Sequence, residues 1–126
     1  MVDAAVEDLR FPKAVRLRQA SQFKALTFKA RRLRGAIFEI RYCTNDVSTA
    51  RLGLMIPKRL ARRSILRNLI KRLVREAFRV RLPLLPSVDI VVRLSRPVAL
   101  ATPEGRSPQR RQLRADIDTL LAGLAA

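Results

Sequence analysis

Residues 58–81, KRLARRSILRNLIKRLVREAFRVR, place basic and apolar residues on opposite sides of one helix. At about 100° per residue, the apolar positions fall within an arc of roughly 140°. This pattern predicts a helix that packs on a core through one side and meets an anion with the other. Phe78 falls on the basic side, so the last turn should bend or meet another element. The apolar arc holds Leu66, Leu69, Ile70, Leu73, Val74 and Ala77, and the other side holds Arg63, Arg67, Asn68, Lys71, Arg72, Arg75 and Arg79.

The charge of the whole chain indicates the same kind of partner. Its 126 residues include 27 Lys and Arg against 10 Asp and Glu, a formal net charge of +17. Such a charge repels itself unless a polyanion neutralises it, and nucleic acid is the usual polyanion. A membrane surface and a merely solvated basic face are the alternatives. No apolar run approaches the roughly 18 residues that span a bilayer, and residues 1–10 are acidic and do not resemble a signal peptide.

Shorter patterns on both sides of the basic helix predict the rest of one domain. Residues 1–10 are expected to form a flexible acidic tail and residues 11–126 a single domain. The order of the elements predicts an α+β fold, an α/β sandwich with a small mixed sheet of about four strands and three helices. The expected elements are a short strand at 14–18, a helix at 21–32, strands at 36–44, 51–56 and 88–94, an irregular connection at 97–111 and a C-terminal helix at 112–124.

The residue types give little support for catalysis by the protein itself. The chain has no histidine, its carboxylates are scattered, and its glycines do not form a phosphate-binding loop. We therefore expect no catalytic residue and no metal site in the protein. The one cysteine, Cys43, suits a reducing compartment and more often packs than reacts. A binding protein is the favoured class.

The basic helix resembles a known signature. Residues 65–79, ILRNLIKRLVREAFR, are similar to that of the bacterial ribonuclease P protein family, whose core reads roughly Arg-Asn-Arg-x-Lys-Arg-x-x-Arg-Glu. Leu69 replaces the third residue of the triplet, and the matching residues are Arg67, Asn68, Lys71, Arg72, Arg75 and Glu76. RLGLMIPKR, FPKAVRLRQASQF and VDIVVRL resemble the family's other segments in the right order.

This resemblance implies a fold and a function. The family's protein binds a large catalytic RNA and helps it remove the 5′ leader of precursor tRNA, while the RNA and its bound Mg²⁺ perform the hydrolysis. The implied protein is cytoplasmic, with no membrane or evident protein partner. The implied fold is ribosomal-protein-like, with a left-handed crossover through the basic helix, against the roughly 98% right-handed norm. The implied RNA-binding residues are Lys58, Arg59, Arg62, Arg63, Arg67, Asn68, Lys71, Arg72 and Arg75, and the implied leader-binding cleft holds Phe23, Phe28, Phe38 and Tyr42.

The residues themselves agree with these roles but leave alternatives. Arg67, Lys71 and Arg75 recur every four residues, about 6 Å apart along the helix, which is comparable to the spacing of phosphates. Aromatic rings beside cations suit unstacked bases. For Phe38, however, a place in the core is favoured over the cleft, and for Tyr42 the two are nearly equal. A structural rRNA-binding protein of ribosomal type is the alternative function.

Overall fold

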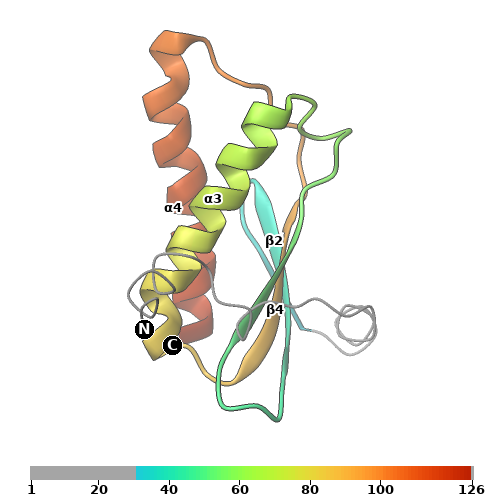
Figure 1. Cartoon of the computed structure of the whole chain (residues 1–126), viewed down its shortest axis with the longest axis vertical. Helices are drawn as coiled ribbons and strands as arrows, with labels where there is room; N and C mark the ends of the chain where they lie inside the picture. The colour runs from blue at the N-terminus through green and yellow to red at the C-terminus, as the bar shows by residue number, and fades with distance from the viewer. Residues whose placement is uncertain (1–30, 126) are drawn as a thin grey trace, which may run out of the picture.

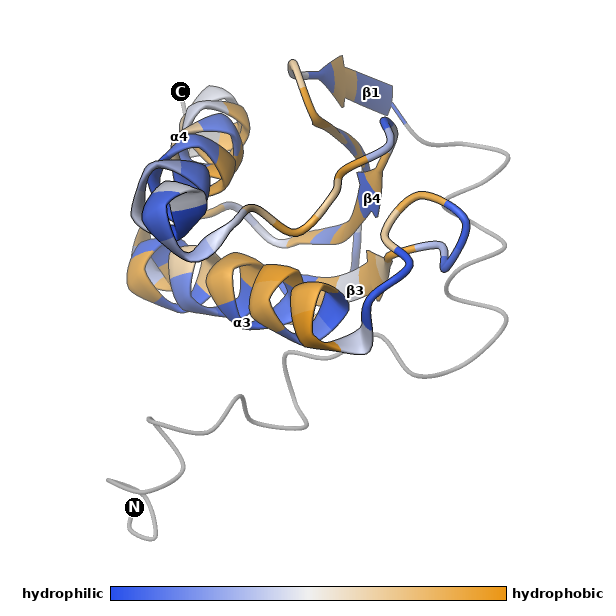
Figure 2. Ribbon diagram, turned by 90° about the horizontal axis from the view of Figure 1, so that it is seen from above, coloured by the Kyte–Doolittle hydropathy of each residue, from blue (hydrophilic) through white to orange (hydrophobic). Residues whose placement is uncertain are grey.

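The computed structural model describes residues 31–125, which form a mixed four-stranded sheet with two α-helices on one face (Figures 1 and 2). The strand order is β1-β2-β4-β3; β3 and β4 are parallel and the other pairs antiparallel. The elements are β1 (Arg31–Arg34), β2 (Phe38–Thr44), β3 (Arg51–Met55), α3 (Ser64–Arg81), the 3₁₀ turn η2 (Leu82–Leu84), β4 (Val88–Leu94), the 3₁₀ turn η3 (Pro103–Gly105) and α4 (Arg106–Ala125).

The predicted α+β class and the sheet of about four strands are confirmed, whereas three helices are not matched within residues 31–125. The expected strand at 14–18 and most of the expected helix at 21–32 lie outside the described residues. The last two residues of that helix, Arg31 and Arg32, instead begin β1. The Gly35 N–H donates to the Phe38 carbonyl at 2.8 Å and closes a hairpin, so β1 pairs with β2. The predicted left-handed crossover stays a prediction; α3 does join the parallel strands β3 and β4.

Two predicted helix boundaries were wrong by six residues. Residues 58–63 are a loop, and α3 begins at Ser64, although its end before Pro83 is as expected. The connection predicted at 97–111 ends earlier, because η3 starts at Pro103 and α4 at Arg106. Pro108 lies in the first turn of α4, where the missing N–H has no partner within the helix and costs little.

The core fills the space between the sheet and the two helices. Leu66, Ile70 and Val74 of α3 are at most 1% exposed, and Leu69 and Leu73 pack at the edge of the core, half-buried. Phe78 is fully buried, so the last turn of α3 does meet other elements, as expected from its position outside the apolar arc. From the sheet and α4, the buried residues include Phe38, Ile40, Ile90, Val92, Leu94, Leu113, Ile117 and Leu121.

A single carboxylate joins the β1–β2 hairpin to α4. Asp116 accepts hydrogen bonds from the backbone N–H groups of Ala36 at 2.9 Å, Ile37 at 3.0 Å and Phe38 at 2.9 Å. The approach is so close that a Cβ added at Gly35 would lie 2.6 Å from the Asp116 Oδ1 atom. Three otherwise unmatched donors are thereby satisfied, and the hairpin is fixed on the helix.

Replacing Asp116 by Asn is expected to lower the free energy of unfolding by about 2 kcal/mol, because one amide oxygen then faces three N–H donors. The matched control is Asp118→Asn, two residues further on. Asp118 is 31% exposed and pairs with Arg81 and Arg114, so its loss should cost less than about 1 kcal/mol. Urea denaturation followed by circular dichroism measures both. Equal losses would contradict a specific role for Asp116.

Candidate nucleic-acid interface

The loop between β3 and α3 presents four cations, Lys58, Arg59, Arg62 and Arg63, all of them exposed. The loop is anchored by backbone hydrogen bonds: Leu60 and Ala61 donate to the Pro57 carbonyl, and Val98 donates to the Leu60 carbonyl at 2.7 Å. The Ala61 side chain is fully buried beneath the loop. The loop therefore holds its cations on an ordered backbone that adjoins the first turn of α3.

Arg67 holds this loop against α3. Its Nη1 atom donates to the Ala61 carbonyl at 3.0 Å and to the Arg62 carbonyl at 2.8 Å, and its side chain is half-buried. Sequence reasoning placed Arg67 only among the RNA-binding residues. The structure gives it a second task, the positioning of the cations of the loop.

Changing Arg67 to Gln should loosen the loop. We expect the amide hydrogens of Leu60 and Ala61 to exchange about tenfold faster, which corresponds to the loss of roughly 1.4 kcal/mol from a charged hydrogen bond. Arg72→Gln is the control, since it removes one cation from the same helix without touching the loop. Hydrogen exchange followed by mass spectrometry or NMR measures the change. Unaltered exchange in Arg67→Gln would show that the loop does not depend on this side chain.

The outer side of α3 carries the other predicted RNA-binding residues. Asn68, Arg72 and Arg75 are exposed and Lys71 is half-buried. Glu76, the acidic residue of this segment, is engaged by Arg79 at 2.7 Å, and this hydrogen bond lowers the pKa of the Glu76 carboxyl. Within residues 31–125, Arg62, Arg63, Lys71 and Arg72 form no ion pair. Together with the four cations of the loop, Asn68, Lys71, Arg72 and Arg75 form what we call the cationic strip.

Phe38 lies in the core, the position that the sequence favoured over the implied leader cleft, and Tyr42 lies on the same side of the sheet. Phe38 is 1% exposed and belongs to the core, and Tyr42 is half-buried against it. In β2 these residues share a face with Ile40, the face that α3 and α4 cover. The sheet must bury one face, and these rings supply it. Phe23 and Phe28 lie outside the described residues.

The second face of the sheet carries arginines that the sequence reasoning missed as site residues. The register places Arg32 opposite Arg41, and Arg34 opposite Glu39. The buried Glu39 carboxylate lies 3.1 Å from Arg41, 3.5 Å from Arg34 and 3.8 Å from Arg32. The strand alternation already separated Glu39 and Arg41 from Phe38, so the signal was present in the sequence.

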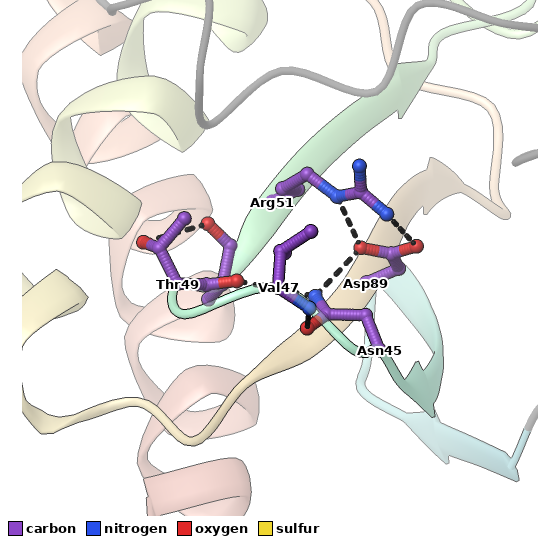
Figure 3. A network of polar contacts seen from close by, with 6 residues as sticks. Asn45, Val47, Thr49, Arg51 and Asp89 are labelled. Carbon is purple, nitrogen blue, oxygen red and sulfur yellow. Dashed lines mark hydrogen bonds and ion pairs between the residues drawn. The ribbon is translucent and has the colours of Figure 1, made fainter.

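Further along this face, Asp89 fixes Arg51 and the loop between β2 and β3 (Figure 3). Arg51 donates to both carboxylate oxygens of Asp89, at 2.7 and 2.9 Å, which raises the pKa of the guanidinium. Asn45 donates to the same carboxylate at 2.9 Å and to the Thr49 carbonyl. Beside this network, burial raises the pKa of the Cys43 thiol, and the charge of Asp89 adds to the effect.

Arg93 is the fifth arginine of this face, and its hydrogen bonding differs from that of Arg51. It lies opposite Glu39 in the register, yet its Nε atom is buried without a hydrogen-bond partner among the described residues. Buried N–H donors in folded proteins almost always have a hydrogen-bond acceptor, so one is expected here. The described part of this face holds five arginines, Arg32, Arg34, Arg41, Arg51 and Arg93, against two carboxylates, Glu39 and Asp89, so it too is positive.

The donor types on both surfaces suit anion binding and not metal binding. Among residues 31–125, no three Cys, Asp or Glu side chains gather closely enough to hold a metal ion. Neither of the described helices has an apolar stretch long enough to cross a lipid bilayer. The fold and its surfaces define a small α+β protein with two cationic faces, suited to a polyanion.

The comparisons with known proteins agree with this class and narrow it. The model of the ribonuclease P family matches residues 11–123. The ribonuclease P protein component of Azoarcus sp. (strain BH72) is 43% identical over 102 residues, 81% of this chain and 85% of that protein. That of Bordetella parapertussis is 40% identical over 120 residues, 90% and 94% of the two chains. The structure of the Staphylococcus aureus RNase P protein superposes with a TM-score of 0.75 at 26% identity, covering 90% of this chain and all of that one.

The chain belongs to the ribonuclease P protein family. The resemblance seen in the basic helix is thereby confirmed. It also holds beyond the segments that first indicated it, since the match continues into α4.

Proposed function

We propose that this chain is the protein component of ribonuclease P, and that its cationic strip binds the catalytic RNA subunit. The observation that carries the proposal is the strip itself, a row of cations on one side of a helix whose other side is fixed in the core. Of these cations, Arg62, Arg63 and Arg72 are exposed and form no ion pair within residues 31–125. Lys58, Arg59, Arg62 and Arg63 approach the RNA from the loop, and Asn68, Lys71, Arg72 and Arg75 from α3. Guanidinium groups bind phosphates in pairs of hydrogen bonds, and Asn68 suits a base edge or a 2′-hydroxyl.

We assign the hydrolysis of the precursor tRNA to the RNA subunit. Support comes from the donor types: among residues 31–125, no three Cys, Asp or Glu side chains gather closely enough to hold a metal ion. We therefore propose that Mg²⁺ is bound by the phosphates of the RNA and the substrate. The protein contributes positive charge and shape. A reducing cytoplasm is the compartment we propose, in keeping with the single cysteine of the chain, Cys43.

The direct test adds the full-length protein to the catalytic RNA subunit of the same organism and a precursor tRNA at low Mg²⁺. We expect the protein to enhance cleavage at the 5′ end of the mature tRNA, because its cations replace part of the counterion atmosphere that Mg²⁺ otherwise supplies. An absence of enhancement, together with preferential binding of rRNA, would favour the ribosomal-type alternative instead.

The cationic strip is tested by charge removal. The double change Lys71→Gln with Arg72→Gln should weaken binding of the RNA subunit and reduce the slope of log K against log salt by about 1.5–2, since two phosphate contacts are lost. The control, Arg111→Gln with Arg114→Gln on α4, removes the same charge outside the strip. Filter binding at several salt concentrations measures both. Equal slopes for the two double variants would contradict the assigned strip.

For the 5′ leader of precursor tRNA, we propose the second face of the sheet. Support comes from two features: the excess of arginine there, and the Nε atom of Arg93, which has no hydrogen-bond partner among residues 31–125. Single-stranded nucleic acid binds where cations follow its backbone and flat groups stack on its bases, and guanidinium planes can do both. Arg32 and Arg41, which the register places side by side, are the first candidates.

Arg41→Gln should therefore weaken binding of precursor tRNA about fivefold to tenfold and leave binding of mature tRNA unchanged, because only the precursor carries a leader. Arg114→Gln is a close control. Arg41 is 28% exposed and Arg114 30%, and each is 3.1 Å from a carboxylate. Affinities are measured on the assembled complex with RNA subunit. A loss shared equally by both tRNAs would exclude a leader site at Arg41.

A further inference from the structure

A pocket of about 160 Å³ lies between the N-terminal halves of α3 and α4. Apolar side chains from two segments line it, together with three arginine side chains. The apolar residues are Ile65 and Leu69 of α3 and Leu100 of the connection after β4; the arginines are Arg72, Arg106 and Arg110. The position of Leu69 is where the related signature has an arginine, so an apolar surface replaces a cation there.

The connection that carries Leu100 is held in place by α4. Gln109 accepts a hydrogen bond from the Ala101 N–H at 3.0 Å and donates to the Ala99 carbonyl at 2.6 Å, on either side of Leu100. Arg106 donates to the Ala101 carbonyl at 3.3 Å. The apolar wall of the pocket is thus built by specific hydrogen bonds and does not depend on a loose loop.

The electrostatic surroundings of the pocket favour an anion. No carboxylate lines it, and within residues 31–125 neither Arg72 nor Arg110 forms an ion pair. Both helices begin at the same end of the molecule, the upper end in Figure 1. α3 has no acidic residue in its first turn, so the positive end of its dipole adds to the three guanidinium charges. Glu104 of η3 lies two residues before α4.

An inorganic anion would pair with the arginines of the pocket but would leave its apolar residues uncovered. Ile65 is 55% exposed although it adjoins Leu69 and Leu100. A cavity of roughly 150 Å³ accommodates a benzene-sized ring. A ligand with a flat ring and an attached phosphate satisfies both parts of the pocket, and an unpaired nucleotide is such a ligand.

We propose that this pocket binds one unpaired nucleotide of the RNA subunit, with its base against Ile65, Leu69 and Leu100. The phosphates on either side of that base lie against Arg72, Arg106 and Arg110. This inference rests on the proposed function, because the RNA is the polyanion that the cationic strip brings to the same end of α3. The pocket would make binding depend on the shape of the RNA, since only a base that is unpaired and turned out of its helix can enter it.

Two matched pairs of variants test the pocket in the full-length protein with the catalytic RNA subunit of the same organism. Ile65→Ser is compared with Val80→Ser, as Ile65 is 55% and Val80 53% exposed on the same helix. Arg110→Gln is compared with the neighbouring Arg111→Gln. We expect Ile65→Ser and Arg110→Gln each to weaken RNA binding about tenfold, as expected for one lost stacking or phosphate contact. The two controls should change it less than about threefold.

The salt dependence separates the two parts of the pocket. Ile65→Ser should leave the salt slope unchanged, while Arg110→Gln should reduce it by about 1. Chemical probing of RNA 2′-hydroxyl flexibility should reveal one unpaired nucleotide that is protected by the wild-type protein and by Val80→Ser, and that is released by Ile65→Ser.

Three results would overturn the proposal. In the first, Ile65→Ser binds RNA as tightly as Val80→Ser, and Arg110→Gln as tightly as Arg111→Gln. The second is a probing pattern in which no nucleotide responds to Ile65→Ser. The third is a self-associating protein that Ile65→Ser renders monomeric, which would assign the pocket to a second copy of the chain. In each case, enhanced cleavage at low Mg²⁺ and a response to Lys71→Gln with Arg72→Gln would show that the proposed function still stands.

Discussion

The burial of one side of α3 is the constraint on which the rest of the structure depends. Leu66, Ile70 and Val74 are at most 1% exposed between the sheet and α4. Each fully buried aliphatic side chain contributes about 1.5–3 kcal/mol relative to an exposed one, so rotation of the helix about its axis would be costly. With the rotation fixed, every cation at the intervening positions must face outward. The core therefore orients the cationic strip, although no core residue belongs to it.

The sheet also has two chemically different faces, and the sequence predicted them only in part. Period-two patterning showed correctly that Phe38, Ile40 and Tyr42 share a face and that Glu39 and Arg41 share the other. It could not show which face the helices cover, because both faces of β2 include buried residues. Phe38, for which the core was favoured over the leader cleft, is buried in the core, and Tyr42, for which the two were nearly equal, is half-buried against it. The arginines on the second face were visible, but nothing local distinguished them from ordinary solvated charges.

Elements with strong local signals were predicted well, and those that depend on tertiary contacts were not. α3 and β4 follow from helical periodicity and from a β-branched run. β1, with the sequence RRLR, has no strand pattern of its own and exists because the hairpin pairs it with β2. Asp116 was noted only as a scattered carboxylate. Its three backbone donors lie about eighty residues away in sequence, so no reading of its neighbours reveals them.

Charge links the stability of this protein to its ligand. A formal net charge of +17 opposes the compact state through self-repulsion. Ion pairs reduce this repulsion locally: Glu39 pairs with three arginines, and Asp89 pairs with Arg51. Arg62, Arg63, Lys71 and Arg72 form no ion pair with the carboxylates of residues 31–125. A polyanion that binds the folded state alone stabilises it by mass action, by about 2.7 kcal/mol at a free concentration one hundred times Kd. RNA binding and folding are therefore coupled. The core places the cations on one side of the molecule, and bound RNA would neutralise the repulsion between them.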